Sequence, residues 1–215
     1  QSFGLLSGGC LEQHIRQQAR KVASLKRPQC IVYDGNDEDN IAAELGLGCN
    51  GRVEILLHLI EAGHHAILKT LLNRLEAGVS SMVAQCFASG NEEDMNQLLL
   101  LDADGQYLMQ ALESPIPELP SMPIGDHANY EKYGRKWAFN KHTPPPELWV
   151  IGGGVDAAPV IDFASQLGWK TTLVDHRPGY ALAQNFNQEA KILHLKPHEF
   201  DGTPDPQAVI IMSHN

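Results

Sequence analysis

Hydrophobic and polar positions follow an ordered pattern over residues 148–177. A short apolar run at Leu148–Ile151 leads into three glycines, then into apolar residues at helical spacing, and finally into a second apolar run that ends at Asp175. Short apolar runs bounded by glycine indicate buried strands, and spacings of three and four indicate a helix with one apolar face. The pattern predicts a strand, a tight turn, a helix and a second strand, which together form the βαβ unit of a Rossmann-like fold.

The glycines of this unit have the spacing of a dinucleotide-binding turn. Gly152, Gly154 and Ala157 match G-x-G-x-x-A, in which the small residues permit the turn, the approach of a pyrophosphate and close packing of helix on strand. Asp175 stands about twenty residues further on, where an acidic side chain accepts hydrogen bonds from a ribose hydroxyl. The same glycines also serve simply to pack a helix on a sheet, so occupancy by a dinucleotide stays open.

Further strands are predicted after this unit. Lys191–Leu195 and Ala208–Met212 are short apolar runs, and Arg177 is a candidate partner for a ligand phosphate. Residues 213–215 are polar and follow the last run, at the edge where open α/β sheets bind ligands, although a frayed end explains them equally well. A doubly wound domain has more strands than these, so we expect the Rossmann-like domain, 147–215, to be incomplete.

The chain begins with a glycine turn that carries a thiol. Ser7, Gly8 and Gly9 predict a turn, and Cys10 opens a helix whose apolar residues are Leu11, Ile15, Ala19 and Val22. A thiol in the first turn of a helix lies near free backbone N–H groups, which favour the thiolate. Cys10 is therefore a candidate reactive or ligating sulfur, and a small residue that fills space beneath the turn is the alternative.

A second glycine loop with a thiol follows. Cys30–Asp34 predicts a strand, Leu45–Gly51 contains three glycines around Cys49, and Val53–Leu59 predicts the next strand. Two such loops in one domain suggest one site, unless each glycine serves a separate turn.

The remaining pattern predicts a mixed α+β domain over residues 1–113. Glu61–Ala77 has helical spacing, Val79–Ala88 is a strand with Cys86 in the core, and Leu98–Asp102 with Gln106–Met109 forms a hairpin. His64 and His65 are adjacent, so they cannot chelate one metal from a helix and are expected at the surface or at the helix start. Prolines and interleaved aromatic and basic residues over 114–146 are typical of a linker that packs its aromatic side chains on a domain. A surface that stacks on nucleic acid or on a pterin is the alternative, which the acidic composition disfavours.

Composition excludes several classes of protein. The 215 residues are 43% hydrophobic and 20% charged, as in globular proteins, and a net charge of −10 argues against a general nucleic-acid or anionic-membrane surface. No apolar run approaches the roughly 20 residues that cross a bilayer, and no secretory signal begins the sequence. The four cysteines show no C-x-x-C spacing, so we expect reduced thiols in a cytoplasmic protein.

Four motifs together resemble the XdhC/CoxI family. They are GLLSGGCLE at 4–12, YDGNDED at 33–39, LGLGCNGRVEILL at 45–57 and GGGVDAAPVIDFASQLGWKTTLVDHRP at 152–178, in the family order. The resemblance implies an accessory factor that binds molybdenum cofactor (molybdopterin) and helps to mature and insert it into xanthine dehydrogenase or a related molybdenum hydroxylase. It places the cofactor-binding cysteine of the SGGC motif at Cys10, next to Gly8 and Gly9, and the GLGC motif at Cys49. Soft sulfur suits such a metal centre.

The resemblance also implies partners, and two competitors stay open: an enzyme, and a plain interaction module whose glycine loops are only structural. The implied partners are the target hydroxylase, a cysteine desulfurase and a second copy of the chain. The family pattern often has a histidine soon after the Rossmann glycines, where this chain has Val155 and Asp156, so the ligand of that domain stays open. The enzyme alternative is an NAD(P)-dependent oxidoreductase that uses Gly152, Gly154 and Asp175, although no acid/base pair can be placed beside a nicotinamide.

Overall fold

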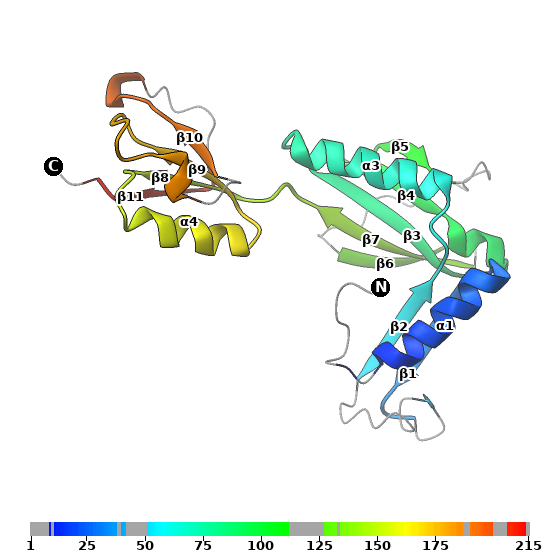
Figure 1. Ribbon diagram of the computed structural model, residues 1–215. Coiled ribbons are helices and arrows are strands. Elements are labelled where there is room, and N and C mark those ends of the chain that lie inside the picture. The colour runs from blue at the N-terminus through cyan, green and yellow to red at the C-terminus, as the bar shows by residue number, and fades with distance from the viewer. Residues whose placement is uncertain are drawn as a thin grey trace. The chain divides into compact units, whose positions relative to one another are not determined.

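The computed structural model divides the chain into two compact units, Gln1–Thr143 and Pro144–Asn215. It describes residues 9, 11–37, 40–41, 51–111, 127–132, 134–186, 190–199 and 206–213. The fold class predicted from the sequence, an α/β chain with a mixed α+β N-terminal part and a Rossmann-like C-terminal part, is confirmed. Each unit is described by itself below (Figure 1).

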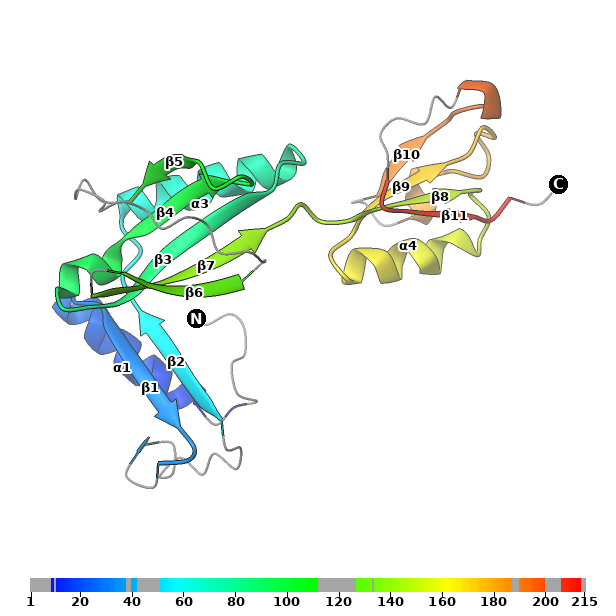
Figure 2. The ribbon, with the colours of Figure 1, turned by 180° about the vertical axis from the view of Figure 1, so that it is seen from behind.

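The N-terminal unit begins with a helix packed on a two-stranded sheet. Helix α1 (Glu12–Leu25) precedes the antiparallel strands β1 (Gln29–Asp34) and β2 (Arg52–Leu57). Leu11, Ile31 and Tyr33 are buried between them because alternate strand residues point towards the helix. Figure 2 shows α1 lying along one face of this strand pair, which leaves the other face to carry Cys30, Asp34, Arg52 and Glu54.

A second helix covers part of a five-stranded antiparallel sheet. Helix α3 (Ala62–Glu76) buries Ile67 and Leu71 against Val83, Leu98 and Leu100 of the sheet. The sheet order is β5-β4-β3-β7-β6. Its strands and one short 3-10 helix are β3 (Ser81–Ser89), η1 (Glu92–Asn96), β4 (Leu98–Asp102), β5 (Tyr107–Gln110), β6 (His127–Lys132) and β7 (Arg135–His142).

The described part of the predicted linker is a sheet hairpin, so the linker prediction is wrong there. Strands β6 and β7 pair with each other, and β7 pairs with β3 over most of its length. Trp137 and Phe139 are 3% and 2% exposed, because they alternate inward on β7 and fill the core on the sheet face opposite α3. Lys136 and Ala138 alternate with these aromatics and lie on the other face of β7, and the first unit extends to Thr143.

The C-terminal unit is a parallel sheet with a helix on one face. Its order, β10-β9-β8-β11, places the first strand of the unit between the second and the fourth, as in a Rossmann fold. The core joins Val150 and Leu173 of the strands to Ala157 and Ile161 of the helix. The elements are β8 (Glu147–Ile151), α4 (Ala157–Gln166), β9 (Lys170–Val174), η2 (Ala183–Asn185), β10 (Lys191–Leu193), η3 (Pro197–Glu199) and β11 (Ala208–Ile211).

Most strand and helix predictions are confirmed in type and place. The helices over 61–77 and after Gly152–Gly154, the hairpin around Gly105 and the buried Cys86 all occur as expected. His64 lies at the start of α3, one of its two expected positions, but it is fully buried there. In the described residues, no helix combines the length and the hydrophobicity that crossing a membrane requires.

Candidate functional site

The glycine turn after β8 is held tightly against the rest of the C-terminal unit. Gly152 has φ +115°, and a Cβ there would lie 2.8 Å from the backbone of Met212 and Ser213, which follow β11. A Cβ at Gly153 would meet the backbone of Tyr180 at 3.1 Å. Close backbone packing and positive φ therefore require glycine at 152, and packing leaves little room for a side chain at 153, in addition to any role in letting a phosphate approach.

Asp175 closes the turn from the end of β9. Its Oδ2 accepts a hydrogen bond from the Gly153 N–H at 2.8 Å and another from Arg177 Nη2 at 2.8 Å. Its Oδ1 accepts from the backbone N–H of Arg177 at 2.8 Å and from Arg177 Nε at 3.1 Å. An ionised carboxylate has about four acceptor sites, so the protein's own donors occupy the whole group.

The electrostatics of this cluster follow from those contacts. The Arg177 guanidinium, assisted by the N–H groups of Gly153 and Arg177, holds the pKa of the Asp175 carboxyl well below its ordinary value, although burial opposes the shift. The same hydrogen bonds raise the pKa of Arg177. The guanidinium also stacks 3.7 Å from the ring centroid of Tyr180, which fixes its plane.

In the structure, Asp175 has a different role from the one predicted for it. Gly152, Gly154, Asp175 and Arg177 lie around one turn, as the sequence predicted, but Asp175 binds the turn itself and Arg177. A ribose hydroxyl would have to displace Arg177 to reach the carboxylate. The Arg177 side chain is 39% exposed, which makes it the charged group of this cluster that an anionic ligand can reach. Their binding roles stay predictions.

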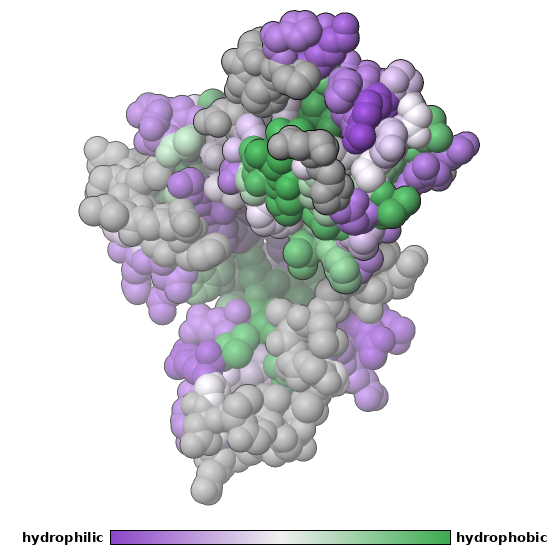
Figure 3. Space-filling model, turned by 90° about the vertical axis from the view of Figure 1, so that its left-hand side faces the viewer, coloured by the Kyte–Doolittle hydropathy of each residue, from purple (hydrophilic) through white to green (hydrophobic). Residues whose placement is uncertain are grey.

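Exposed hydrophobic side chains also lie on the C-terminal unit near the glycine turn. Val155, in the turn before α4, is 96% exposed, and Ile211, at the end of β11, is 71% exposed. Figure 3 shows hydrophobic patches among hydrophilic ones on the side of the molecule that it presents. The turn is therefore bordered by apolar side chains as well as by Arg177.

The N-terminal thiol loops fall mostly outside the described residues. Gly8, Cys10 and Cys49 lie outside them, while Gly9 is described, with φ +116° and open space around the position of a Cβ. Positive φ confirms a turn at Gly9, as the glycine cluster predicted. Within the described ranges, no group of three His, Cys, Asp or Glu side chains is arranged to hold a metal ion.

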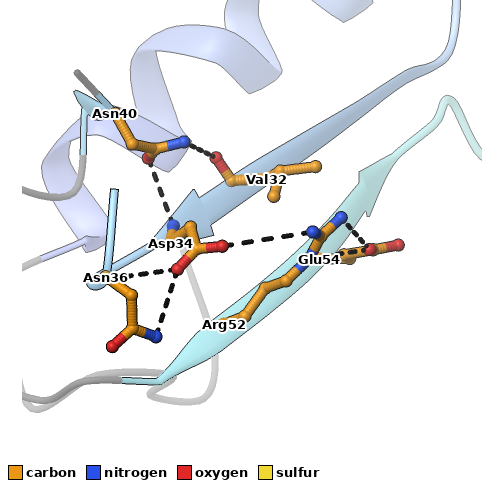
Figure 4. Close-up of polar contacts among 6 residues, drawn as sticks. All are labelled: Val32, Asp34, Asn36, Asn40, Arg52 and Glu54. Atoms are coloured by element: carbon orange, nitrogen blue, oxygen red, sulfur yellow. Dashed lines mark hydrogen bonds and ion pairs between the residues drawn. The ribbon is translucent and has the colours of Figure 1, made fainter. Parts of the chain in front are cut away.

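A polar cluster forms at the ends of β1 and β2, where the YDGNDED motif lies. Asp34 accepts from the backbone and side chain of Asn36, and its own N–H donates to Asn40 Oδ1 at 3.2 Å. Arg52 lies between Asp34, at 4.0 Å, and Glu54, at 2.7 Å (Figure 4). This cluster was not predicted as functional, although the YDGNDED motif contains its Asp34 and Asn36.

Comparisons with known proteins agree with the resemblance described above. Residues 148–215 match the family described as XdhC Rossmann domain. The chain is 23% identical over 218 aligned residues to a protein of Bacillus subtilis (strain 168) whose name describes it as a probable subunit of xanthine dehydrogenase, with 99% of this chain and 63% of that protein covered. The crystal structure of a xanthine dehydrogenase from Bacillus halodurans is similar with a TM-score of 0.75 at 27% identity, covering 99% of this chain and 62% of that one. The chain thus spans about three fifths of the length of these relatives.

Proposed function

Because residues 148–215 form an XdhC Rossmann domain and the whole chain resembles proteins of that family, we propose that this protein is a xanthine-dehydrogenase accessory factor. It binds molybdenum cofactor, assists its maturation and delivers it to a xanthine-dehydrogenase-like molybdenum hydroxylase. The observation that carries the proposal is the similarity over 99% of the chain to a protein named as belonging to xanthine dehydrogenase. Both units of the chain share in that similarity.

The cofactor is the cargo of this protein, and the chain supplies groups that suit its parts. Sulfur from Cys10, with Cys49 as a second thiol, is a soft ligand for molybdenum. The turn at Gly9 adopts positive φ, a conformation that exposes backbone N–H groups to an oxo or phosphate oxygen. The donor set of the N-terminal unit therefore fits a metal centre that carries an anionic organic group.

The Rossmann unit has a separate role in this proposal. Arg177 and the first turn of α4 are the groups that would receive a phosphate, from a nucleotide or from the cofactor itself. An NAD(P)-dependent oxidoreductase is less well supported, because the Asp175 carboxylate that would bind ribose is already saturated by Gly153 and Arg177. The implied partners are the hydroxylase, a cysteine desulfurase and a second copy of the chain, in the cytoplasm.

The test is anaerobic loading with molybdenum cofactor. Wild type, Cys10→Ala and Cys49→Ala are mixed with the cofactor, desalted and assayed for molybdenum and pterin content, with Ser24→Ala on the exposed side of α1 as the control. We expect wild type and Ser24→Ala to retain cofactor and to activate a cofactor-free xanthine dehydrogenase, and Cys10→Ala to lose most of it. Thermal unfolding of each variant separates lost binding from lost folding. If both cysteine variants retain as much cofactor as wild type, the assignment of the thiols is refuted. If wild type itself retains no cofactor, the carrier role is refuted.

A further inference from the structure

A cavity of about 700 Å³ lies in the N-terminal unit between β2 and the β3-β7-β6 part of the five-stranded sheet. This volume is within the range of roughly 300–1,000 Å³ that is typical of small-molecule sites. Its lining includes Arg52, Glu54, Gln85, Phe87, Lys136 and Asn140. None of the residues assigned above to the cofactor or to a nucleotide is among its lining residues.

The sheet face that forms one wall changes from apolar to polar along its width. Under α3 it carries Val83, Leu98 and Leu100. Beyond β3 the same face carries Ala138, opposite Gln85, and Asn140, opposite Val83. Residues directly opposite each other in an antiparallel pair share a face. The polar half is therefore a wall of the cavity, whereas the apolar half belongs to the core.

The side-chain amide of Gln85 is held in one orientation in this wall by the hydrogen bonds of its nitrogen. Its Nε2 donates to the backbone carbonyls of Cys86 at 3.0 Å, Met95 at 3.1 Å and Gln97 at 3.0 Å. Three carbonyl oxygens around one amide nitrogen determine which end of the amide is nitrogen. The side-chain oxygen of Gln85 is thus the end that can accept a hydrogen bond from a ligand N–H group.

Each of the two walls carries one positive and one negative side chain that lie close to each other. On β2, Arg52 Nη2 is 2.7 Å from Glu54 Oε1, and the Asp34 carboxylate steadies the guanidinium from the other side (Figure 4). On the sheet, Lys136 Nζ is 3.9 Å from Glu131 Oε2. Arg52 and Lys136 are 57% and 48% exposed, so an anionic group can reach both. Glu54 is more sheltered, at 32%.

We infer that this cavity binds a phosphorylated heterocycle with adjacent N–H donors, as a pterin or a guanine presents. Glu54 and the Gln85 oxygen accept from the N–H edge of the ring, Phe87 contacts its face, and Arg52 with Lys136 binds the phosphate. The inference rests on the proposed function where it takes the pterin of molybdenum cofactor as the source of this chemistry. A guanine nucleotide is the other source.

Cys30 supplies a reporter for occupancy. Cys30 pairs with Leu56 across β1 and β2, and Leu56 lines the cavity. The half-buried Cys30 thiol therefore lies on the same face of the strand pair as the cavity. Burial and Glu54 raise the pKa of this thiol, while Arg52 and Lys136 lower it from the two walls. A bound ligand would shield Cys30 from alkylation.

The experiment measures binding of neopterin, neopterin monophosphate and GMP to the full chain by ligand fluorescence or calorimetry. The variants are Glu54→Gln and the double variant Arg52→Gln/Lys136→Gln, and Lys69→Gln, which removes a positive charge from the exposed face of α3, is the control. We expect neopterin monophosphate to bind at least tenfold more tightly than neopterin. The double variant removes that advantage, Glu54→Gln weakens both pterins tenfold or more, and Lys69→Gln changes neither. Mass mapping of Cys30 alkylation with and without ligand gives the second readout.

The outcomes separate this inference from the carrier role. Absence of binding by all three probes, or binding that the cavity variants leave unchanged, overturns the inference. Cavity-dependent binding of GMP that is tenfold tighter than that of neopterin monophosphate supports the ligand class and overturns the pterin as its source. If wild type retains molybdenum cofactor while the cavity variants retain it equally, the carrier role stands and the cavity assignment fails. If pterins bind in the cavity but wild type retains no molybdenum cofactor, the carrier role fails instead.

Discussion

The carboxylate of Asp175 accepts a hydrogen bond from the backbone N–H of Gly153 at 2.8 Å, which joins the end of β9 to the glycine turn after β8. Asp175 is 4% exposed and its bond from Gly153 is buried, whereas the bonds from Arg177 are partly buried. An aspartate placed to bind ribose thus acts in this chain as a structural bridge inside the turn. Any ligand of the Rossmann unit meets a turn whose shape Asp175 already fixes.

Replacement of Asp175 by Asn tests this bridge. The amide cannot accept all four donors and leaves Arg177 without its counter-charge, so we expect the free energy of unfolding to fall by about 3 kcal/mol at pH 7. Urea unfolding, followed by Trp fluorescence, measures the change. A loss below about 0.5 kcal/mol would mean that the cluster contributes no more than an exposed ion pair.

The same variant should change the pH dependence of stability. The folded-state pKa of Asp175 lies below its unfolded value, so its stabilisation is complete above about pH 4 and is lost as the pH falls further. Asp94, whose pKa is lowered chiefly by hydrogen bonding to Arg135, adds a slope of the same sign in the N-terminal unit. Between pH 5 and pH 3 we expect Asp175→Asn to lose less stability than wild type. Equal slopes for the two proteins would contradict the assigned shift.

Gly152 and Gly168 offer a matched pair for the glycine turn. Both have positive φ, +115° and +79°, but a Cβ at Gly168 meets open space, whereas one at Gly152 would lie 2.8 Å from the backbone after β11. We expect Gly168→Ala to cost about 1 kcal/mol through backbone strain alone, and Gly152→Ala to cost at least about 2 kcal/mol more through the clash. Denaturant melts of both variants supply the comparison. Similar losses for the two would show that the close approach of β11 relaxes at little cost.

The sequence predicted the parts of this fold that depend on local pattern. The Rossmann unit was found because apolar period, glycine spacing and Asp175 all agree over residues 148–175. The β6–β7 hairpin was not predicted because prolines flank it and basic residues are interspersed with its aromatic residues, a pattern that also suits an exposed linker. Its place in the sheet depends on pairing with β3, some 50 residues earlier, which no local signal contains.

In the candidate sites too, features that depend on local sequence could be predicted, and features that depend on tertiary contacts could not. The spacing in the sequence predicted that Gly152, Asp175 and Arg177 lie together. It did not predict the hydrogen bond from the Gly153 N–H to Asp175, because that bond depends on how closely the ends of β8 and β9 approach each other. The cavity between β2 and the sheet combines residues from four strands. Its residue types are ordinary when read one strand at a time, so only the tertiary arrangement reveals it.

His64 is the clearest case in which tertiary contacts decide a residue's role, and it gives a further prediction. Its Nδ1 accepts from the Glu61 N–H at 3.2 Å, which leaves the proton on Nε2 to donate to the Asn96 carbonyl at 2.6 Å. His64→Ala removes a helix cap and a buried hydrogen bond, so we expect a loss of about 2–3 kcal/mol. The exposed neighbour His65→Ala should cost less than about 0.5 kcal/mol. Thermal unfolding of both variants tests the difference, and equal effects would refute the buried role.

The two described cysteines should differ sharply in reactivity. Cys86 is 0% exposed, and burial, with a smaller effect of Asp94, raises its pKa to about 11. Cys30 is half-buried, and Arg52 and Lys136 partly offset the rise in its pKa. The thiolate is the reactive form, so in native protein at pH 8 we expect iodoacetamide to modify Cys30 at least tenfold faster than Cys86. Peptide mass mapping over time measures both rates, and unfolding in urea should bring them close together. Comparable native rates would mean that the β3 core opens far more often than its packing with Trp137 and Leu99 implies.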